Sequence, residues 1–316
     1  MKLFITSSIP DNIYKKLENE FEITYHDSNE PLTKQEIIDK ISEVDVLFCP
    51  LSDKIDEEII NSAKNLKLVV NYGAGFDNID LKSANKNNIS VCNTPAKSSA
   101  YSTSELAFLL ILSCARDVVG GKSELKSGNF KGWRPTYHLG TQLHGKTLGI
   151  IGFGNIGQSL AKKAVAFGMN VLYNANHQKK ELENETIKFV TKDEIYKNSD
   201  FISLNLSYND KLFHMIDAEQ FDMMKNTAYL INSARGKVVS EQALINAIKD
   251  KKIAGAALDV YEFEPKVSKE LLSFDNCICT PHIGNATVEA REEMGKIAVD
   301  NILAFKNGKE MKNKIN

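Results

Sequence analysis

The stretch Thr147-Leu-Gly-Ile-Ile-Gly152-Phe-Gly154-Asn-Ile-Gly157 decides how this chain of 316 residues folds. Its first half is an apolar strand, and its second half is a Gly-x-Gly-x-x-Gly turn that leads into a helical pattern at 158–167. The first glycine permits a tight turn, the second lets a pyrophosphate approach the backbone, and the third lets helix and strand pack closely. Free N–H groups at the start of the helix would then bind the anion. This context predicts a dinucleotide-binding unit.

Short β-rich apolar runs alternate with helical patterns along the whole chain, which is typical of α/β folds with parallel sheets. Five strands are expected before residue 100, at 2–6, 22–25, 44–49, 68–71 and 90–93. Six more are expected at 147–152, 170–175, 201–206, 228–233, 255–261 and 277–280. The pattern predicts two doubly wound parallel-sheet domains, with a long helix at 101–119, an irregular stretch at 120–145 and a last helix at 286–305.

Length and composition exclude several classes of protein. A chain of 316 residues is about twice the usual ~150-residue domain, and its 42% hydrophobic and 25% charged residues are ordinary for a globular protein. A net charge of -2 argues against a nucleic-acid partner. The longest apolar run, 106–112, is far shorter than the roughly 20 residues that span a membrane, and no signal peptide is evident. A cytoplasmic protein is expected. The five cysteines form no CxxC pair, so no metal site is expected.

The second strand of the dinucleotide unit bears on the choice of coenzyme. Domains that bind NAD place an acid at the end of this strand to hold the ribose, and here the position falls on Ala175. A carboxylate there would repel a 2′-phosphate by roughly 4 kcal/mol at close range, so its absence admits NADP(H). Asn176, His177 and Lys179 follow and are expected to hydrogen-bond the phosphate, although no arginine is present and a solvated loop is the alternative. The prediction is NAD(P)H, with NADPH favoured.

Polar residues end three strands of the second series, where open α/β sheets place their ligands. They are Arg235, the two acids Asp259 and Glu264, and His282. A histidine titrates near neutrality and suits the transfer of a proton to a ketone oxygen, while a neighbouring carboxylate stabilises the imidazolium. An arginine presents a planar fork to a carboxylate and its adjacent carbonyl. This set predicts hydride transfer to a 2-oxo acid, with Asp259 near the nicotinamide or in its supporting shell.

Seven motifs occur in the order in which one known family has them: Asn71-Tyr-Gly-Ala-Gly-Phe-Asp-Asn-Ile-Asp80, Asn93-Thr-Pro95, Gly152-Phe-Gly-Asn-Ile-Gly157, Ser233-Ala-Arg-Gly236, Ala257-Leu-Asp-Val260, Glu264-Pro265 and Thr280-Pro-His-Ile-Gly284. They resemble the D-isomer-specific 2-hydroxyacid dehydrogenases, and the first motif is most similar to the glyoxylate/hydroxypyruvate reductase-like branch. The resemblance implies a catalytic trio of Arg235, Glu264 and His282. It also implies that the N–H groups of Ala74 and Gly75 bind the substrate carboxylate.

The resemblance further implies a discontinuous architecture. Residues 1–100 and 286–316 would form a smaller, flavodoxin-like substrate-binding domain, and residues 101–285 a Rossmann-type dinucleotide-binding domain. A homodimer is implied, with 120–145 as part of the dimer arm. The cofactor contacts expected from the fingerprint and the resemblance are Gly152, Gly154, Asn155, Ile156, Gly157, Ala175, Asn176, His177, Ser233, Ala234, Asp259 and Gly284.

The sequence departs from the family at one motif and allows more than one function, so the substrate stays open. The usual Leu-His-x-Pro near the cofactor is Leu204-Asn205-Leu206-Ser207 here. The leading prediction is a reductase of a small 2-oxo acid such as glyoxylate or hydroxypyruvate. One alternative is a 3-phosphoglycerate dehydrogenase-like enzyme, and another is a non-catalytic nucleotide-sensing regulator on the same fold, as in related transcriptional co-repressors. A formate dehydrogenase is disfavoured because such an enzyme is expected to carry glutamine where Glu264 stands.

Overall fold

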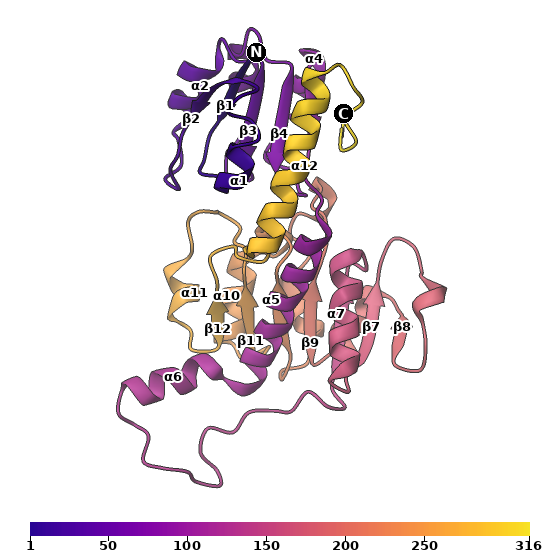
Figure 1. The fold of residues 1–316 in the computed structure, drawn as a ribbon. Helices are drawn as coiled ribbons and strands as arrows, with labels where there is room; N and C mark the ends of the chain where they lie inside the picture. Colours follow the sequence, from indigo (N-terminus) through magenta and orange to yellow (C-terminus); the bar gives the residue numbers. More distant parts are fainter. The chain divides into compact units, whose positions relative to one another are not determined.

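Figure 1 shows the computed structural model, which describes residues 1–316. The chain divides into two compact units, Met1–Ser99 with Asn285–Asn316, and Ala100–Gly284. Each unit holds one sheet in which neighbouring strands run parallel. The predicted α/β class with two parallel sheets is therefore confirmed.

The sheet of the first unit has the order β2-β1-β3-β4-β5. Its strands are β1 Lys2–Ile5, β2 Glu22–Tyr25, β3 Val46–Pro50, β4 Leu68–Tyr72 and β5 Ser90–Cys92. Its helices are α1 Asp11–Tyr14, α2 Lys34–Ile41, α3 Glu57–Ser62, α4 Leu81–Lys86 and α12 Val288–Lys306. The strand order reverses between β1 and β3, as in flavodoxin-like sheets, which bind ligands at the carboxyl ends of their strands.

Helix α12 comes from the far end of the chain and packs along β4 (Figure 1). It buries Met294, Ala298 and Ile302 against the sheet, a spacing of four residues that keeps the three on one helix face. Gly295 lies against Ile13, and any side chain at this position would clash with that residue. The last helical segment therefore completes the core of the unit that the first hundred residues begin.

The sheet of the second unit has the order β12-β11-β10-β9-β6-β7-β8. Its strands are β6 Thr147–Ile151, β7 Asn170–Asn174, β8 Ile187–Phe189, β9 Phe201–Leu204, β10 Tyr229–Asn232, β11 Gly255–Leu258 and β12 Cys277–Cys279. Its longer helices are α7 Asn155–Ala166, α8 Lys192–Asn198, α9 Ala218–Met223, α10 Glu241–Lys249 and α11 Lys269–Ser273, and α5 Lys97–Arg116 and α6 Val118–Lys126 precede β6. Strand β8 was not predicted, because three partly exposed residues at a sheet edge carry little hydrophobic pattern.

The prediction of one helix at 101–119 followed by an irregular stretch was wrong in part. Two helices occupy 97–126, and they are separated at Asp117, whose φ of 44° is left-handed. The Asp117 side chain accepts a hydrogen bond from the Gly120 N–H and so caps the second helix. Glycines in this segment suggested a loop, but a capping aspartate outweighs their low helix propensity. None of the helices, including the 20-residue α5, has the length and apolar character needed to cross a membrane.

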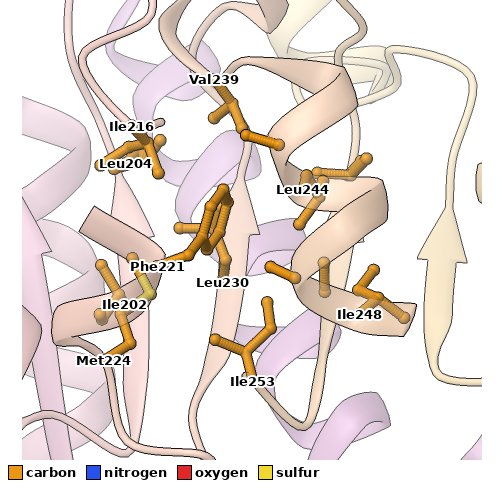
Figure 2. Close-up of a cluster of buried hydrophobic side chains, with 14 of the residues drawn as sticks. Ile202, Leu204, Ile216, Phe221, Met224, Leu230, Val239, Leu244, Ile248 and Ile253 are labelled. Atoms are coloured by element: carbon orange, nitrogen blue, oxygen red, sulfur yellow. The ribbon is translucent and has the colours of Figure 1, made fainter. Parts of the chain in front are cut away.

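Helices α9 and α10 pack on strands β9 and β10 through a continuous layer of apolar side chains. Phe221 from α9 lies at its centre, between side chains of the sheet and Leu244 of α10 (Figure 2). Ile216 and Val239, from the segments that precede these helices, close the layer at the carboxyl ends of the strands. Burial of each such side chain contributes about 1.5–3 kcal/mol. The loops at the carboxyl ends of these strands are therefore anchored to a well-packed core.

Candidate active site

The glycine-rich turn joins β6 to α7 and leaves room for an anion. Gly152 has a φ of 99°, and a side chain there would strike the backbone of Asn205. A side chain at Gly157 would strike the Gly152 carbonyl, whereas nothing lies within 4 Å of the position a Gly154 side chain would occupy. Gly154 caps α7 without any side-chain hydrogen bond, so the first N–H groups of the helix, at Asn155 and after it, are left for a ligand.

Two buried polar atoms that follow the carboxyl ends of β9 and β10 have no hydrogen-bond partner: Asn205 Oδ1 and Ser233 Oγ. Asn205 follows β9 and Ser233 follows β10, and β9 is paired with β6, which ends at the glycine-rich turn. Buried polar atoms normally find a partner, so these two fit the polar groups of a bound dinucleotide. Ser233 was a predicted contact. Asn205 was not, although its place at a strand end next to the fingerprint strand was a usable signal.

The segment after β7 carries no acid at its first positions. Ala175 is half-buried, and Asn176 and His177 are exposed. Beyond them, the Gln178 side chain donates a hydrogen bond of 2.8 Å to the carboxylate of Glu183, which also accepts one from Tyr173. The ribose-binding acid is therefore absent at Ala175 itself, but one carboxylate is held against the same loop.

His282 and Glu264 form a pair at the carboxyl ends of β11 and β12. His282 Nδ1 lies 2.9 Å from Glu264 Oε2, and the Tyr261 N–H donates to the other carboxylate oxygen at 2.8 Å. Both side chains are about one-third exposed, at 36% and 35%. Burial opposes ionisation of Glu264, but the hydrogen bond and charge of His282, the Tyr261 N–H and the charge of Arg235 together hold the pKa of Glu264 below its usual value.

Asp259 holds the loop that carries His282. Its buried carboxylate accepts hydrogen bonds from the Thr280 hydroxyl at 2.6 Å, the Ile283 N–H at 2.8 Å and the Gly284 N–H at 2.8 Å. His282 itself has a φ of 53°, a conformation that only a well-held loop maintains in a residue other than glycine. Of the two roles considered for Asp259, these contacts favour the supporting one.

Arg235 follows β10 and is placed by its own loop. The buried Asn232 side chain donates to the Arg235 carbonyl at 3.0 Å and accepts from the Ala234 N–H at 3.1 Å, which folds the backbone into a fixed turn. Gly236 lies so close to the backbone of Tyr261 that no side chain fits there. The arginine loop therefore lies against the segment that carries Glu264. Sequence reasoning did not single out Asn232.

Ala74 and Gly75 belong to the first unit and follow β4. Asn71 donates to the Gly75 carbonyl at 2.7 Å, Asn93 to the Ala74 carbonyl at 2.7 Å, and the Thr94 N–H to the Gly73 carbonyl at 2.8 Å. The carbonyl groups of this loop are thus satisfied within the unit. The N–H groups of Ala74 and Gly75 donate to no backbone carbonyl, which leaves them for an anion.

Comparison with known proteins decides the family. Residues 108–284 match the model of the D-isomer specific 2-hydroxyacid dehydrogenase, NAD binding domain, more than half of the chain. The chain belongs to this family. A provisionally named 2-hydroxyacid dehydrogenase of Staphylococcus haemolyticus (strain JCSC1435) is 46% identical over 308 residues, which cover 97% of this chain and 96% of that protein. This dehydrogenase is therefore an oxidoreductase whose family domain binds a nicotinamide coenzyme.

Solved structures agree with this assignment along the full length of the dehydrogenase. A protein from Thermus thermophilus has a TM-score of 0.93 and 34% identity, and all of both chains is covered. A glyoxylate reductase from Paecilomyes thermophila has a TM-score of 0.87 and 29% identity, with coverage of 100% of this chain and 98% of that one.

The second unit of the dehydrogenase brings most of the predicted site residues to one edge of its sheet. Each predicted residue of this unit follows the carboxyl end of a strand or starts the helix after it; these are the fingerprint residues 152–157, then 175–177, 233–235, 259, 264, 282 and 284. Ala74 and Gly75 lie at the corresponding edge of the other sheet. The structure adds Asn205 and Asn232 to the set.

Proposed function

We propose that this dehydrogenase reduces a small 2-oxo acid of the glyoxylate or hydroxypyruvate type with NAD(P)H and produces the D-2-hydroxy acid. The observation that carries the proposal is the hydrogen-bonded His282–Glu264 pair, whose carboxylate also interacts with the charge of Arg235. A proton donor, a carboxylate that stabilises it and a guanidinium are the groups that reduction of a 2-oxo acid requires.

Each group of the site has a defined role in this reaction. Gly152, Gly154 and the start of α7 would hold the pyrophosphate of a nicotinamide coenzyme, which would supply the hydride. Arg235 binds the substrate through its planar fork and polarises the carbonyl. The N–H groups of Ala74 and Gly75 bind the substrate carboxylate.

His282 donates the proton that the carbonyl oxygen needs, and Glu264 keeps the imidazole charged and oriented. We assign the substrate-binding role to the unit that contains Ala74 and Gly75, and the coenzyme-binding role to Ala100–Gly284.

Initial rates of NADPH and NADH oxidation, measured in parallel with several 2-oxo acids, test the proposal. Glyoxylate and hydroxypyruvate are expected to be turned over with the highest kcat/KM. Phosphohydroxypyruvate belongs in the series, because preference for it would favour the 3-phosphoglycerate dehydrogenase reading. Binding of both coenzymes without turnover of any 2-oxo acid would favour a nucleotide-sensing regulator. The similarity to a glyoxylate reductase supports the first outcome.

We expect NADPH to be preferred, and Ala175→Asp to reverse the preference. A carboxylate at the end of β7 would repel the 2′-phosphate and accept hydrogen bonds from the ribose of NAD. The ratio of kcat/KM for NADPH to that for NADH should fall by about tenfold or more, since 1.4 kcal/mol is tenfold and the repulsion is of that order or larger. Ala175→Asn is the control of equal size without charge. An unchanged ratio in the aspartate variant, or NADH preference in the wild type, would show that the charge argument is wrong.

Glu264→Gln is expected to shift the pH profile of reduction towards acid. Reduction needs a charged His282, so kcat/KM falls as pH rises and the histidine loses its proton. Without the carboxylate 2.9 Å from Nδ1, the imidazolium loses the negative charge that stabilises it, so the alkaline limb of the profile should move to lower pH. The pKa of Glu264 lies below its usual value, so the wild-type carboxylate stays ionised at neutral pH and protonates only on the far acid side. A profile of kcat/KM between pH 5 and 9 checks this, and an unmoved alkaline limb would contradict it.

We also propose a homodimer that pairs through α6 and the segment after it. In Figure 1 this part of the second unit extends away from the sheet. It exposes a series of large apolar side chains, namely Val118, Val119, Leu125, Phe130, Trp133 and Leu139. Exposed apolar patches of this kind mark protein interfaces. Light scattering should give twice the chain mass of 35.2 kDa, and a monomer mass would refute the pairing.

A further inference from the structure

A second histidine–glutamate pair lies outside the proposed catalytic groups. His214 Nε2 is 2.7 Å from Glu262 Oε1, and the exposed fractions of the two side chains are 28% and 10%. The pair borders a cavity of about 630 Å³ that Glu241, Phe263 and Lys266 also line. The proposed reaction uses neither residue. Yet Glu262 is only two residues before Glu264.

Glu262 joins its loop to the start of α10. Its second carboxylate oxygen accepts a hydrogen bond from the Glu241 N–H at 3.0 Å, and its own N–H donates to the Glu241 carboxylate at 3.3 Å. Glu241 is 8% exposed. A carboxylate held by a histidine on one side and a helix start on the other has little freedom to turn.

The same residues connect to the arginine loop. The His214 N–H donates to the Lys237 carbonyl at 2.9 Å, and the Ile216 N–H donates to the Val238 carbonyl at 3.0 Å. The segment that carries His214 therefore runs beside the residues that directly follow Arg235 and Gly236. Ile216 is also part of the apolar layer in Figure 2, which anchors this segment to the sheet.

The backbone of His214 is held in an uncommon conformation. Its φ is 50°, in the left-handed region, and its ring stacks on Phe213 with centroids 3.8 Å apart. A residue other than glycine stays in this region only where its surroundings hold it, and such residues are concentrated at functional sites. In this chain His282 shares the feature, as do Asn88, Asp117, His138 and Lys251.

The segment 261–264 is thus held at each of its polar positions. The Tyr261 hydroxyl donates to the Thr280 carbonyl at 2.8 Å, and the Tyr261 N–H donates to Glu264. Glu262 is held by His214 and Glu241. Glu264 therefore contacts His282 from a segment that these hydrogen bonds hold in place. If the Glu262 contacts were lost, the Tyr261 N–H and the Glu264 carboxylate would lose their common alignment.

We propose that His214 is a positioning residue that acts through Glu262 to align Glu264 with His282. The inference rests on the proposed roles of Glu264 and His282. It concerns the same reaction but a residue that does not touch the reacting atoms. His214→Ala should lower kcat about tenfold, because small misplacement of a catalytic group has effects of this size or larger. It should also move the alkaline limb of kcat/KM towards lower pH, the direction expected for Glu264→Gln.

Three further variants test this role against a merely structural one. His214→Gln retains an N–H donor towards Glu262 and should restore kcat to within about threefold of wild type. Lys225→Ala, the control, removes the ion pair with Asp200 in the same unit, at the amino ends of the strands. It should change the melting temperature without moving the pH profile. In a Glu264→Gln background, His214→Ala should have little further effect on kcat, since the two changes act through one group.

The outcomes are distinct. Unchanged kcat and pH profile in His214→Ala, or an effect that simply multiplies with that of Glu264→Gln, would overturn the positioning role. If His214→Ala does not fold, His214→Gln decides the question. The glutamine keeps an N–H donor towards Glu262, so a low kcat and a shifted pH profile in this variant would also overturn the positioning role. His282→Ala is assayed in parallel. Near-normal turnover in His282→Ala would refute the proposed function itself. If His282→Ala loses its turnover while His214→Ala behaves as wild type, only the positioning role is refuted.

Discussion

His282→Ala is expected to lower kcat for reduction of a 2-oxo acid by about two to four orders of magnitude, the range that a general acid contributes. Within the His282–Glu264 pair the imidazole is the group proposed to donate the proton, because the pKa of Glu264 lies below its usual value and this carboxylate is ionised at neutral pH. When it is removed, the developing oxyanion must take its proton from water. The loss should therefore appear in kcat more than in KM.

Coenzyme binding provides the control for this variant. The glycine-rich turn, Asn205 and Ser233 are all separate from the imidazole, and Asp259 holds the 280–284 loop through Thr280, Ile283 and Gly284 rather than through His282. The dissociation constant for NADPH or NADH, measured by fluorescence titration, should stay within about twofold of wild type. Near-normal turnover in His282→Ala would contradict the assignment of the proton donor.

Arg235→Lys is expected to lower kcat/KM by about a hundredfold although the charge is kept. A guanidinium binds a carboxylate and its neighbouring carbonyl through two parallel N–H groups, and a lysine offers only a point charge on a flexible stem. A loss of about 3 kcal/mol in transition-state binding corresponds to this factor. Steady-state kinetics with glyoxylate and hydroxypyruvate would measure it.

Folding should be little affected by the lysine variant. The turn that holds residue 235 depends on the Asn232 side chain and on backbone groups, which the substitution leaves in place. The melting temperature is therefore expected to match that of wild type. Arg235→Ala should lose more activity than Arg235→Lys, because charge and fork are both removed. Equal kcat/KM for lysine and arginine would show that the planar fork has no role.

Most of the fold could be predicted because its signals are local. Buried parallel strands are short apolar runs, and the glycine spacing at 152–157 reports a strand–turn–helix unit directly. Where the local signal was weak, prediction failed. The edge strand β8 has three partly exposed residues, and the break at Asp117 depends on one side chain that caps α6.

Part of the candidate site could also be predicted from the sequence, and part could not. The residue types and their order in the chain pointed to Arg235, Glu264 and His282, but the spacing of 29 residues between the first two says nothing of distance in space. Asn205 stands where the family motif Leu-His-x-Pro has its histidine, which put it near the cofactor without predicting a contact, and Asn232 carried no such signal. Asn205 is marked by a buried oxygen without a hydrogen-bond partner and Asn232 by the hydrogen bond of its side chain to the Arg235 carbonyl, and both features are visible only in the folded chain.

By itself the sequence determined the α/β class, the dinucleotide turn and the chemistry available, because glycine spacing, apolar periodicity and residue type are properties of the chain. Only the tertiary structure decided that His282 meets Glu264 at 2.9 Å, that Asp259 supports the histidine loop, and that His214 and Glu262 stabilise the segment in front of Glu264. These contacts join residues from different strand ends. The physical reason is that hydrogen bonds act over about 3 Å, and only the packing of the sheet brings such distant residues so close.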